Sequence, residues 1–121
     1  MNGTIRTLIA EDYPLFRMIL RQSLAQDPNV ELVGESMDGL DVVEKAHLLR
    51  PDLVLMDVSL PLLGGLEATR LIREGTPGTK VVLLLEDDNR EYREAANASG
   101  ASAYLAKVNM SRDLLNLMRS L

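Results

Sequence analysis

Short apolar runs alternate with segments of helical hydrophobic period along the whole chain. Residues 53–56 and 81–85 are apolar runs without polar alternation, which is typical of strands buried on both faces of a parallel sheet. The predicted strands are residues 4–10, 30–35, 53–56, 81–85 and 103–106. The pattern therefore predicts a parallel sheet covered by helices.

Between these runs, apolar residues recur at the spacing of one helical face. Pro14 suits the first turn of a helix over residues 14–25, where its missing N–H costs nothing. Asp38 can cap a second helix that Pro51 ends. Gly64-Gly65 opens a third, Asp88 or Asn89 caps a fourth, and an apolar stripe from Met110 to Leu121 predicts a fifth.

Five strand–helix units in alternation predict an α/β fold with right-handed crossovers. A flavodoxin-like doubly wound parallel sheet of order 2-1-3-4-5 fits this pattern, as does another doubly wound order. In both, ligands bind beyond the carboxyl ends of the strands. The chain shows no linker, repeat or low-complexity stretch, so we expect one domain over residues 1–121.

Composition narrows the classes of function. The 121 residues hold 13 basic and 18 acidic side chains, for a net charge of −5, and no cysteine. The absence of cysteine excludes disulfides and thiolate metal sites, and the lack of basic runs makes this chain a poor nucleic-acid binder. There is neither a membrane-length apolar run nor a signal-peptide pattern, so we expect a cytoplasmic protein.

Four charged residues follow the predicted strands. Glu11 and Asp12 come after the first strand, Asp57 after the third and Lys107 after the fifth. In a sheet of order 2-1-3-4-5 all four side chains would meet at one edge, an inference that depends on the strand order. Neighbouring carboxylates repel unless a cation neutralises them, and Mg²⁺ accepts such oxygen ligands. Each residue alone has an ordinary alternative as a helix cap, a turn former or a solvated side chain.

Several sequence blocks, in this order, resemble the response-regulator receiver domains of the CheY-like type, and the resemblance covers the whole chain. They are Leu-Ile-Ala-Glu11-Asp12-Tyr-Pro-Leu-Phe-Arg, Leu-Met-Asp57-Val-Ser-Leu-Pro61, Gly65-Leu-Glu-Ala-Thr and Gly100-Ala-Ser-Ala-Tyr104-Leu-Ala-Lys107. The Pro-Leu-Phe-Arg run and the residue after Lys107, which is not proline, look most like the NarL/LuxR-type transcriptional regulators.

The resemblance implies a role for each matching residue. Asp57 would be the phosphoacceptor, a carboxylate nucleophile, and Lys107 would neutralise a phosphoryl oxygen. Tyr104 would be the aromatic switch residue. The implied Mg²⁺ ligands are Glu11 through water, Asp12, Asp57 and the backbone carbonyl of Ser59. Pro61 and Gly65 would shape the loop after the nucleophile.

Leu85 departs from the family pattern, because receivers usually carry Thr or Ser at the end of the fourth strand, where the hydroxyl donates to a phosphoryl oxygen. Leucine cannot donate, and losing a hydrogen bond to a charged acceptor costs about 1.5–3 kcal/mol. Two hypotheses stay open. Either Asp57 is phosphorylated and the signal reaches Tyr104 weakly, or the chain is an atypical receiver that dimerises or binds proteins without phosphorylation.

An enzyme of another class must also be weighed. Haloacid-dehalogenase-type phosphatases place a nucleophilic Asp after an apolar strand and a second Asp two residues later. Here that second position is Ser59, which makes a phosphatase a poor fit. As a receiver, the chain would be no enzyme beyond its own phosphorylation and dephosphorylation.

The resemblance also implies partners. They would be a sensor histidine kinase or a small phosphodonor, and a second copy of the chain. The dimer would form through the fourth helix, fifth strand and fifth helix, or through the first and fifth helices. The first of these surfaces includes Tyr92, Arg93, Tyr104 and Arg112. DNA would be bound only by a helix-turn-helix domain beyond Leu121, if the natural chain continues there.

Overall fold

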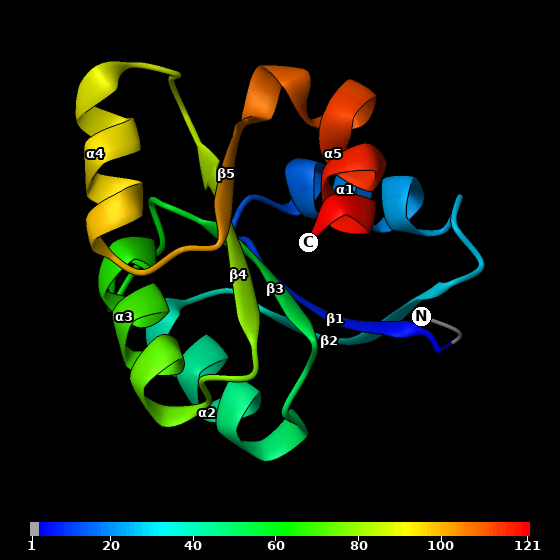
Figure 1. The fold of residues 1–121 in the computed structure, drawn as a ribbon, viewed down its shortest axis with the longest axis horizontal. Coiled ribbons are helices and arrows are strands. Elements are labelled where there is room, and N and C mark those ends of the chain that lie inside the picture. The colour runs from blue at the N-terminus through cyan, green and yellow to red at the C-terminus, as the bar shows by residue number, and fades with distance from the viewer. Residues whose placement is uncertain (1–2) are drawn as a thin grey trace.

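The fold is a five-stranded parallel sheet of order β2-β1-β3-β4-β5 (Figure 1). The computed structural model describes residues 3–121. The strands are β1 (Ile5–Ala10), β2 (Val30–Ser36), β3 (Leu53–Asp57), β4 (Lys80–Leu85) and β5 (Ala103–Ala106). The predicted flavodoxin-like doubly wound order is thereby confirmed over the alternative orders.

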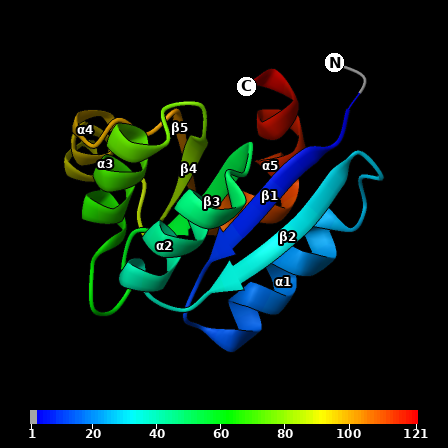
Figure 2. The same cartoon turned by 90° about the horizontal axis from the view of Figure 1, so that it is seen from below.

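Five α-helices cover the two faces of the sheet. They are α1 (Pro14–Leu24), α2 (Gly39–Leu49), α3 (Gly65–Gly75), α4 (Arg90–Ala98) and α5 (Met110–Ser120), and a short 3₁₀ turn, η1 (Lys107–Asn109), joins β5 to α5. Helices α2, α3 and α4 lie on one face, and α1 and α5 on the other (Figure 2). No helix in residues 3–121 is long and apolar enough to cross a membrane.

Two apolar clusters form the core, one on each face of the sheet. Ala10, Met56 and Leu85 belong to the cluster under α2, α3 and α4. Ile9, Leu55 and Leu84 belong to the cluster under α1 and α5. Adjacent residues of one strand therefore face opposite cores, which explains why β1, β3 and β4 are apolar without alternation.

Side chains at two helix starts accept hydrogen bonds from backbone N–H groups of the first turn. The Asp38 side chain accepts a hydrogen bond from Asp41 N at 2.7 Å at the start of α2, and Asn89 accepts one from Tyr92 N at 2.9 Å at the start of α4. Such caps satisfy backbone donors that a helix leaves free. Of the two candidate caps for the fourth helix, the structure therefore selects Asn89.

Strand β3 extends one residue further than the apolar pattern predicted. Asp57 is its last residue and is paired with Leu84 of β4. Parallel pairing is carried by backbone groups, so a polar side chain at the end of a strand does not interrupt it. The consequence is that the Asp57 backbone is held by the sheet and not by a loop.

Gly65 permits a close approach between α3 and the end of β3. A Cβ atom at residue 65 would lie 2.1 Å from the backbone oxygen of Asp57 and 2.8 Å from Val58 Cα. Gly65 N also donates to Val58 O at 3.0 Å. The absence of a side chain at residue 65 therefore sets how closely the third helix packs against Asp57.

We predict that Gly65→Ala lowers the free energy of unfolding by about 2 kcal/mol or more, because backbone must shift to admit the methyl group. The measurement is chemical denaturation followed by circular dichroism. The matched control is Gly78→Ala, because a Cβ there meets nothing within 4 Å. Equal stability of the two variants would contradict the steric argument.

Candidate functional site

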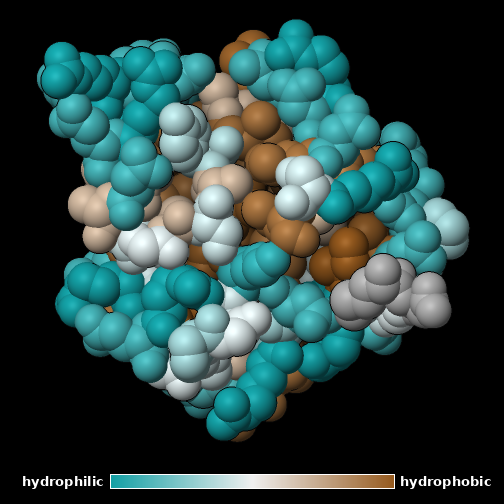
Figure 3. Space-filling model, in the orientation of Figure 1, coloured by the Kyte–Doolittle hydropathy of each residue, from teal (hydrophilic) through white to brown (hydrophobic). Residues whose placement is uncertain are grey.

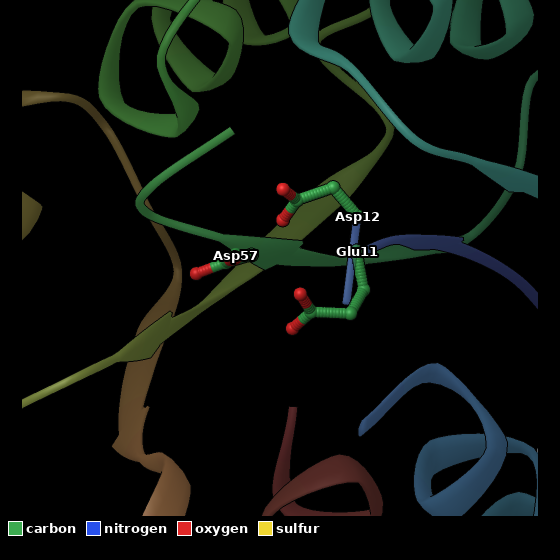
Figure 4. Close-up of side chains that lie close together, drawn as sticks. All are labelled: Glu11, Asp12 and Asp57. Atoms are coloured by element: carbon green, nitrogen blue, oxygen red, sulfur yellow. The ribbon is translucent and has the colours of Figure 1, made fainter. Parts of the chain in front are cut away.

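The carboxylates of Glu11, Asp12 and Asp57 gather at the carboxyl edge of the sheet, where β1 and β3 are neighbours (Figure 4). One oxygen from each lies within 4.8 Å of the others. They open into a pocket of about 350 Å³, whose lining residues are Glu11, Asp12, Tyr13, Phe16, Asp57, Ser59, Glu86 and Lys107. The strand order thus places these three carboxylates together with Lys107 in one pocket.

Glu11 is the most enclosed acid of the site, with no exposed surface. Tyr13 N donates to Glu11 Oε2 at 3.1 Å. The other oxygen, Oε1, lies 3.1 Å from Lys107 Nζ in an ion pair, yet accepts no hydrogen bond from residues 3–121. Burial raises the pKa of Glu11 to about 7; the Asp57 charge adds to this, and the Tyr13 N–H and Lys107 oppose it.

Asp57 is 2% exposed and is held from two directions. Ser59 N donates to Asp57 Oδ1 at 3.2 Å, and Lys107 Nζ lies 3.3 Å from the same oxygen. The loop that follows turns tightly at Leu62, where φ is 67° and Leu63 N donates to Pro61 O at 2.7 Å. This geometry is that of a γ-turn, and it brings the chain back to Gly65.

Lys107 is surrounded by carboxylates. Its Nζ lies 3.0 Å from Glu86 Oε1, 3.1 Å from Glu11 Oε1 and 3.3 Å from Asp57 Oδ1. It also lies 4.7 Å from the centre of the Phe16 ring, a favourable cation–π position. Burial alone would lower the pKa of Lys107, but Glu86, Glu11 and Asp57 outweigh it and raise that pKa above its usual range.

The donor set fits a hard divalent cation. Three carboxylates converge there, and the buried oxygen Glu11 Oε1 has the Lys107 ion pair but no well-aligned hydrogen bond among the described residues. Oxygen donors of this type bind Mg²⁺, which keeps several waters and needs few protein ligands. Because the single ammonium of Lys107 faces several acids, a cation would remove repulsion that the protein leaves uncompensated.

Leu85 and Tyr104 belong to the neighbouring strands β4 and β5, where Tyr104 is paired with Leu83. Leu85 is fully buried in the cluster under α2, α3 and α4, and Tyr104 packs against that cluster while remaining partly exposed. Leu85 is paired with Ala106 of β5. The end of β4 therefore presents packed hydrocarbon, and no hydroxyl, next to the pocket.

Two pocket residues were not predicted as lysine partners. They are Phe16 of α1 and Glu86, the residue after β4. The sequence signal for Glu86 is its position directly after β4, which mirrors the positions of Glu11 after β1 and Lys107 after β5. Phe16 offers no such signal, because its spacing is that of any core residue.

This fold, with acids and a lysine at the point where the strand order reverses, defines the class of receiver-type signalling domains. The profile of the family described as "Response regulator receiver domain" matches residues 7–119. The chain belongs to this family.

Relatives of several architectures share this domain. Response regulator protein VraR of Staphylococcus saprophyticus is 35% identical over 117 residues, which are 95% of this chain and 55% of that protein. Protein-glutamate methylesterase/protein-glutamine glutaminase 4 of Myxococcus xanthus is 44% identical over 108 residues, 88% of this chain and 30% of that protein.

A LuxR-family two-component response regulator from Aurantimonas superposes with a TM-score of 0.91 at 27% identity, covering 98% of this chain and 84% of that one. The similarity to NarL/LuxR-type regulators is thereby confirmed. The chain spans about half the length of VraR and less than a third of the length of the methylesterase.

We predict that Asp57→Asn raises the free energy of unfolding in chelator by about 1 kcal/mol, because it removes one charge from the cluster while Asn can still accept from Ser59 N. Thermal and chemical denaturation measure this change. Asp87→Asn is the control, since Asp87 is exposed and forms no ion pair with residues 3–121. Lower stability of Asp57→Asn than of the control would contradict the repulsion.

The raised pKa of Glu11 gives the wild type a pH signature. Its folded value of about 7 exceeds the ordinary value of 4.5, so the folded state binds more protons between these limits and the free energy of unfolding falls as pH rises from 4.5 to 7. In Asp57→Asn we expect the free energy of unfolding to fall less over this pH range, because the Asp57 charge that helps to raise the pKa of Glu11 is gone. An identical pH profile in both would contradict the coupling.

Proposed function

We propose that this chain is the phosphoacceptor receiver of a two-component response regulator with a transcriptional output. The observation that carries the proposal is the position of Asp57, whose buried carboxylate lies close to the Glu11 and Asp12 carboxylates and 3.3 Å from Lys107 Nζ. Membership of the receiver family supports it. The donor would be a sensor histidine kinase or a small phosphorylated compound.

Phosphoryl transfer to Asp57 mainly requires a well-positioned carboxylate nucleophile and positive charge near the phosphoryl oxygens. A carboxylate oxygen of Asp57 attacks phosphorus while the phosphorus–nitrogen bond of a phosphohistidine breaks, and the electron pair of that bond stays on the imidazole. The product is an acyl phosphate on Asp57. Lys107, already 3.3 Å from Asp57 Oδ1, pairs with a phosphoryl oxygen. Hydrolysis of the acyl phosphate restores Asp57 and releases inorganic phosphate.

Mg²⁺ would be held by Asp12, Asp57 and the Ser59 backbone carbonyl, with Glu11 acting through water. When bound, it supplies positive charge next to the transferring phosphoryl group. Glu11 and Asp12 orient this charge, and Ser59 N keeps Asp57 in place through its hydrogen bond at 3.2 Å.

Leu85 favours a second candidate function, that of a dimerisation or protein-binding module independent of phosphorylation. With no hydroxyl at the end of β4, the coupling between a phosphoryl group and Tyr104 loses a contact worth about 1.5–3 kcal/mol. A typical allosteric coupling is about 1–3 kcal/mol. The retained acids and Lys107 favour phosphorylation, so this module remains the alternative.

The proposed partner surface is α4–β5–α5. Strand β5 is an edge strand paired only with β4, and apolar side chains reach the surface over β5 and the adjoining side of α5 (Figure 3). Ala103, Tyr104 and Leu105 are all partly exposed. Tyr92, Arg93 and Arg112 border this surface. The face of α1 and α5 is the alternative, and a helix-turn-helix domain beyond this chain would contact DNA.

We predict that wild type binds beryllofluoride with Mg²⁺, seen as shifts of backbone amide signals, and gains one phosphoryl group from phosphoramidate, seen by intact mass. Asp57→Asn should do neither, because beryllofluoride adds to the carboxylate oxygen. Asp87→Asn should behave as wild type. No spectral change at saturating reagent would exclude phosphorylation, and steady turnover of a phosphate ester would instead indicate a phosphatase.

We predict that Leu85→Thr binds beryllofluoride about tenfold more tightly than wild type, since a hydroxyl donates to a charged acceptor. Its free energy of unfolding should fall by about 2 kcal/mol through lost packing. Leu85→Val is the matched control, because valine has the shape of threonine without the hydroxyl. Equal affinity in the threonine and valine variants would show that the missing hydroxyl does not weaken the response.

A further inference from the structure

Glu86 links the ends of β4 and β5 through Lys107. It directly follows Leu85 at the end of β4, and its Oε1 lies 3.0 Å from Lys107 Nζ, at the end of β5. This is the shortest of the three carboxylate contacts that Lys107 makes. Before any phosphoryl group arrives, the ammonium that should receive it is therefore already paired.

The three partners of Lys107 differ in their freedom to leave it. Glu11 is fully buried and Asp57 is 2% exposed, so neither can turn away without opening the core. The Glu86 side chain is 52% exposed, and water can solvate it in another rotamer. Glu86 is thus the partner that can release Lys107 at low cost.

A phosphoryl group on Asp57 would compete with Glu86 directly. Four acidic side chains and one lysine line the pocket, and a phosphoryl group adds further negative charge. Its oxygens and the Glu86 carboxylate would be held near the same ammonium, where like charges repel. Among the described residues, Lys107 is the one basic side chain that lines the pocket, so the phosphoryl group and Glu86 compete for the same ammonium.

Glu86 is also connected to α4. The segment from Glu86 to Asn89 joins β4 to this helix. Asn89 caps α4 by accepting from Tyr92 N at 2.9 Å, and Tyr92 packs against the cluster that contains Leu85. A change at Glu86 therefore acts on the loop that sets the start of α4.

We propose that Glu86 is the responding residue at the end of β4, in place of the hydroxyl that Leu85 lacks. In the resting state Glu86 holds Lys107. When a phosphoryl group on Asp57 pairs with Lys107, the Glu86 side chain rotates into solvent. The β4–α4 loop then shifts together with the beginning of α4. This inference rests on the proposed function, since it needs phosphorylation of Asp57, and it identifies the residue that transmits that event.

The test compares wild type, Glu86→Gln and Asp87→Asn, each labelled with ¹⁵N. Both variants lose one charge from the same loop, but only Glu86 touches Lys107. Amide spectra are recorded without ligand and during titration with beryllofluoride and Mg²⁺. Without ligand, we expect the amide signals of residues 86–92 in Glu86→Gln to lie near their positions in beryllofluoride-bound wild type. We expect those of Asp87→Asn to lie near unliganded wild type.

The titration gives a second readout. Glu86→Gln should bind beryllofluoride about five- to tenfold more tightly than wild type, because Lys107 has lost its competing partner. Asp87→Asn should differ by less than about twofold. If both variants bind equally and the loop of unliganded Glu86→Gln does not move, the role of Glu86 is overturned while phosphorylation stands. If neither wild type nor Glu86→Gln binds, the proposed function fails, and this inference fails with it.

Discussion

Repulsion among carboxylates at the carboxyl edge of the sheet is the constraint on which the site depends. The order of the strands brings one carboxylate oxygen each of Glu11, Asp12 and Asp57 within 4.8 Å of one another, and among residues 3–121 only Lys107 lines their pocket with a positive charge. Such an arrangement costs folding free energy in the absence of a cation. The same unbalanced negative charge is what a divalent cation bound between these carboxylates would neutralise.

Leu85 illustrates how packing and signalling compete at one residue. Its side chain completes the cluster under α2, α3 and α4 and is fully buried, which stabilises the end of β4. The same side chain cannot hydrogen-bond to an anion in the pocket. The polar contact between β4 and Lys107 is instead made by the next residue, Glu86. The end of β4 thus presents an acidic acceptor and no hydroxyl donor, and this carboxylate would repel a phosphoryl group where a hydroxyl would donate to it.

Much of the fold could be predicted from local patterns, because those patterns have local causes. The apolar runs marked strands buried on both faces. The cap at Asp38 marked the start of α2, and the start of α4 was predicted to within one residue, at Asp88 or Asn89. The last residue of β3 was missed, since Asp57 joins the ladder through backbone groups that hydropathy does not report. The candidate site was predicted as far as its acids and lysine follow the strands, whereas Phe16 beneath Lys107 carries no distinguishing signal.

The sequence by itself determined that acids and a lysine stand at the ends of alternating strands in a doubly wound α/β chain. Only the tertiary structure decided that β1 lies between β2 and β3, which puts Asp57 beside Glu11 and Asp12. It also decided which carboxylates reach Lys107 and which of them water can solvate. The physical reason is that periodicity records the burial of each residue's own side chain. Distances between charges depend on strand pairing across the whole chain.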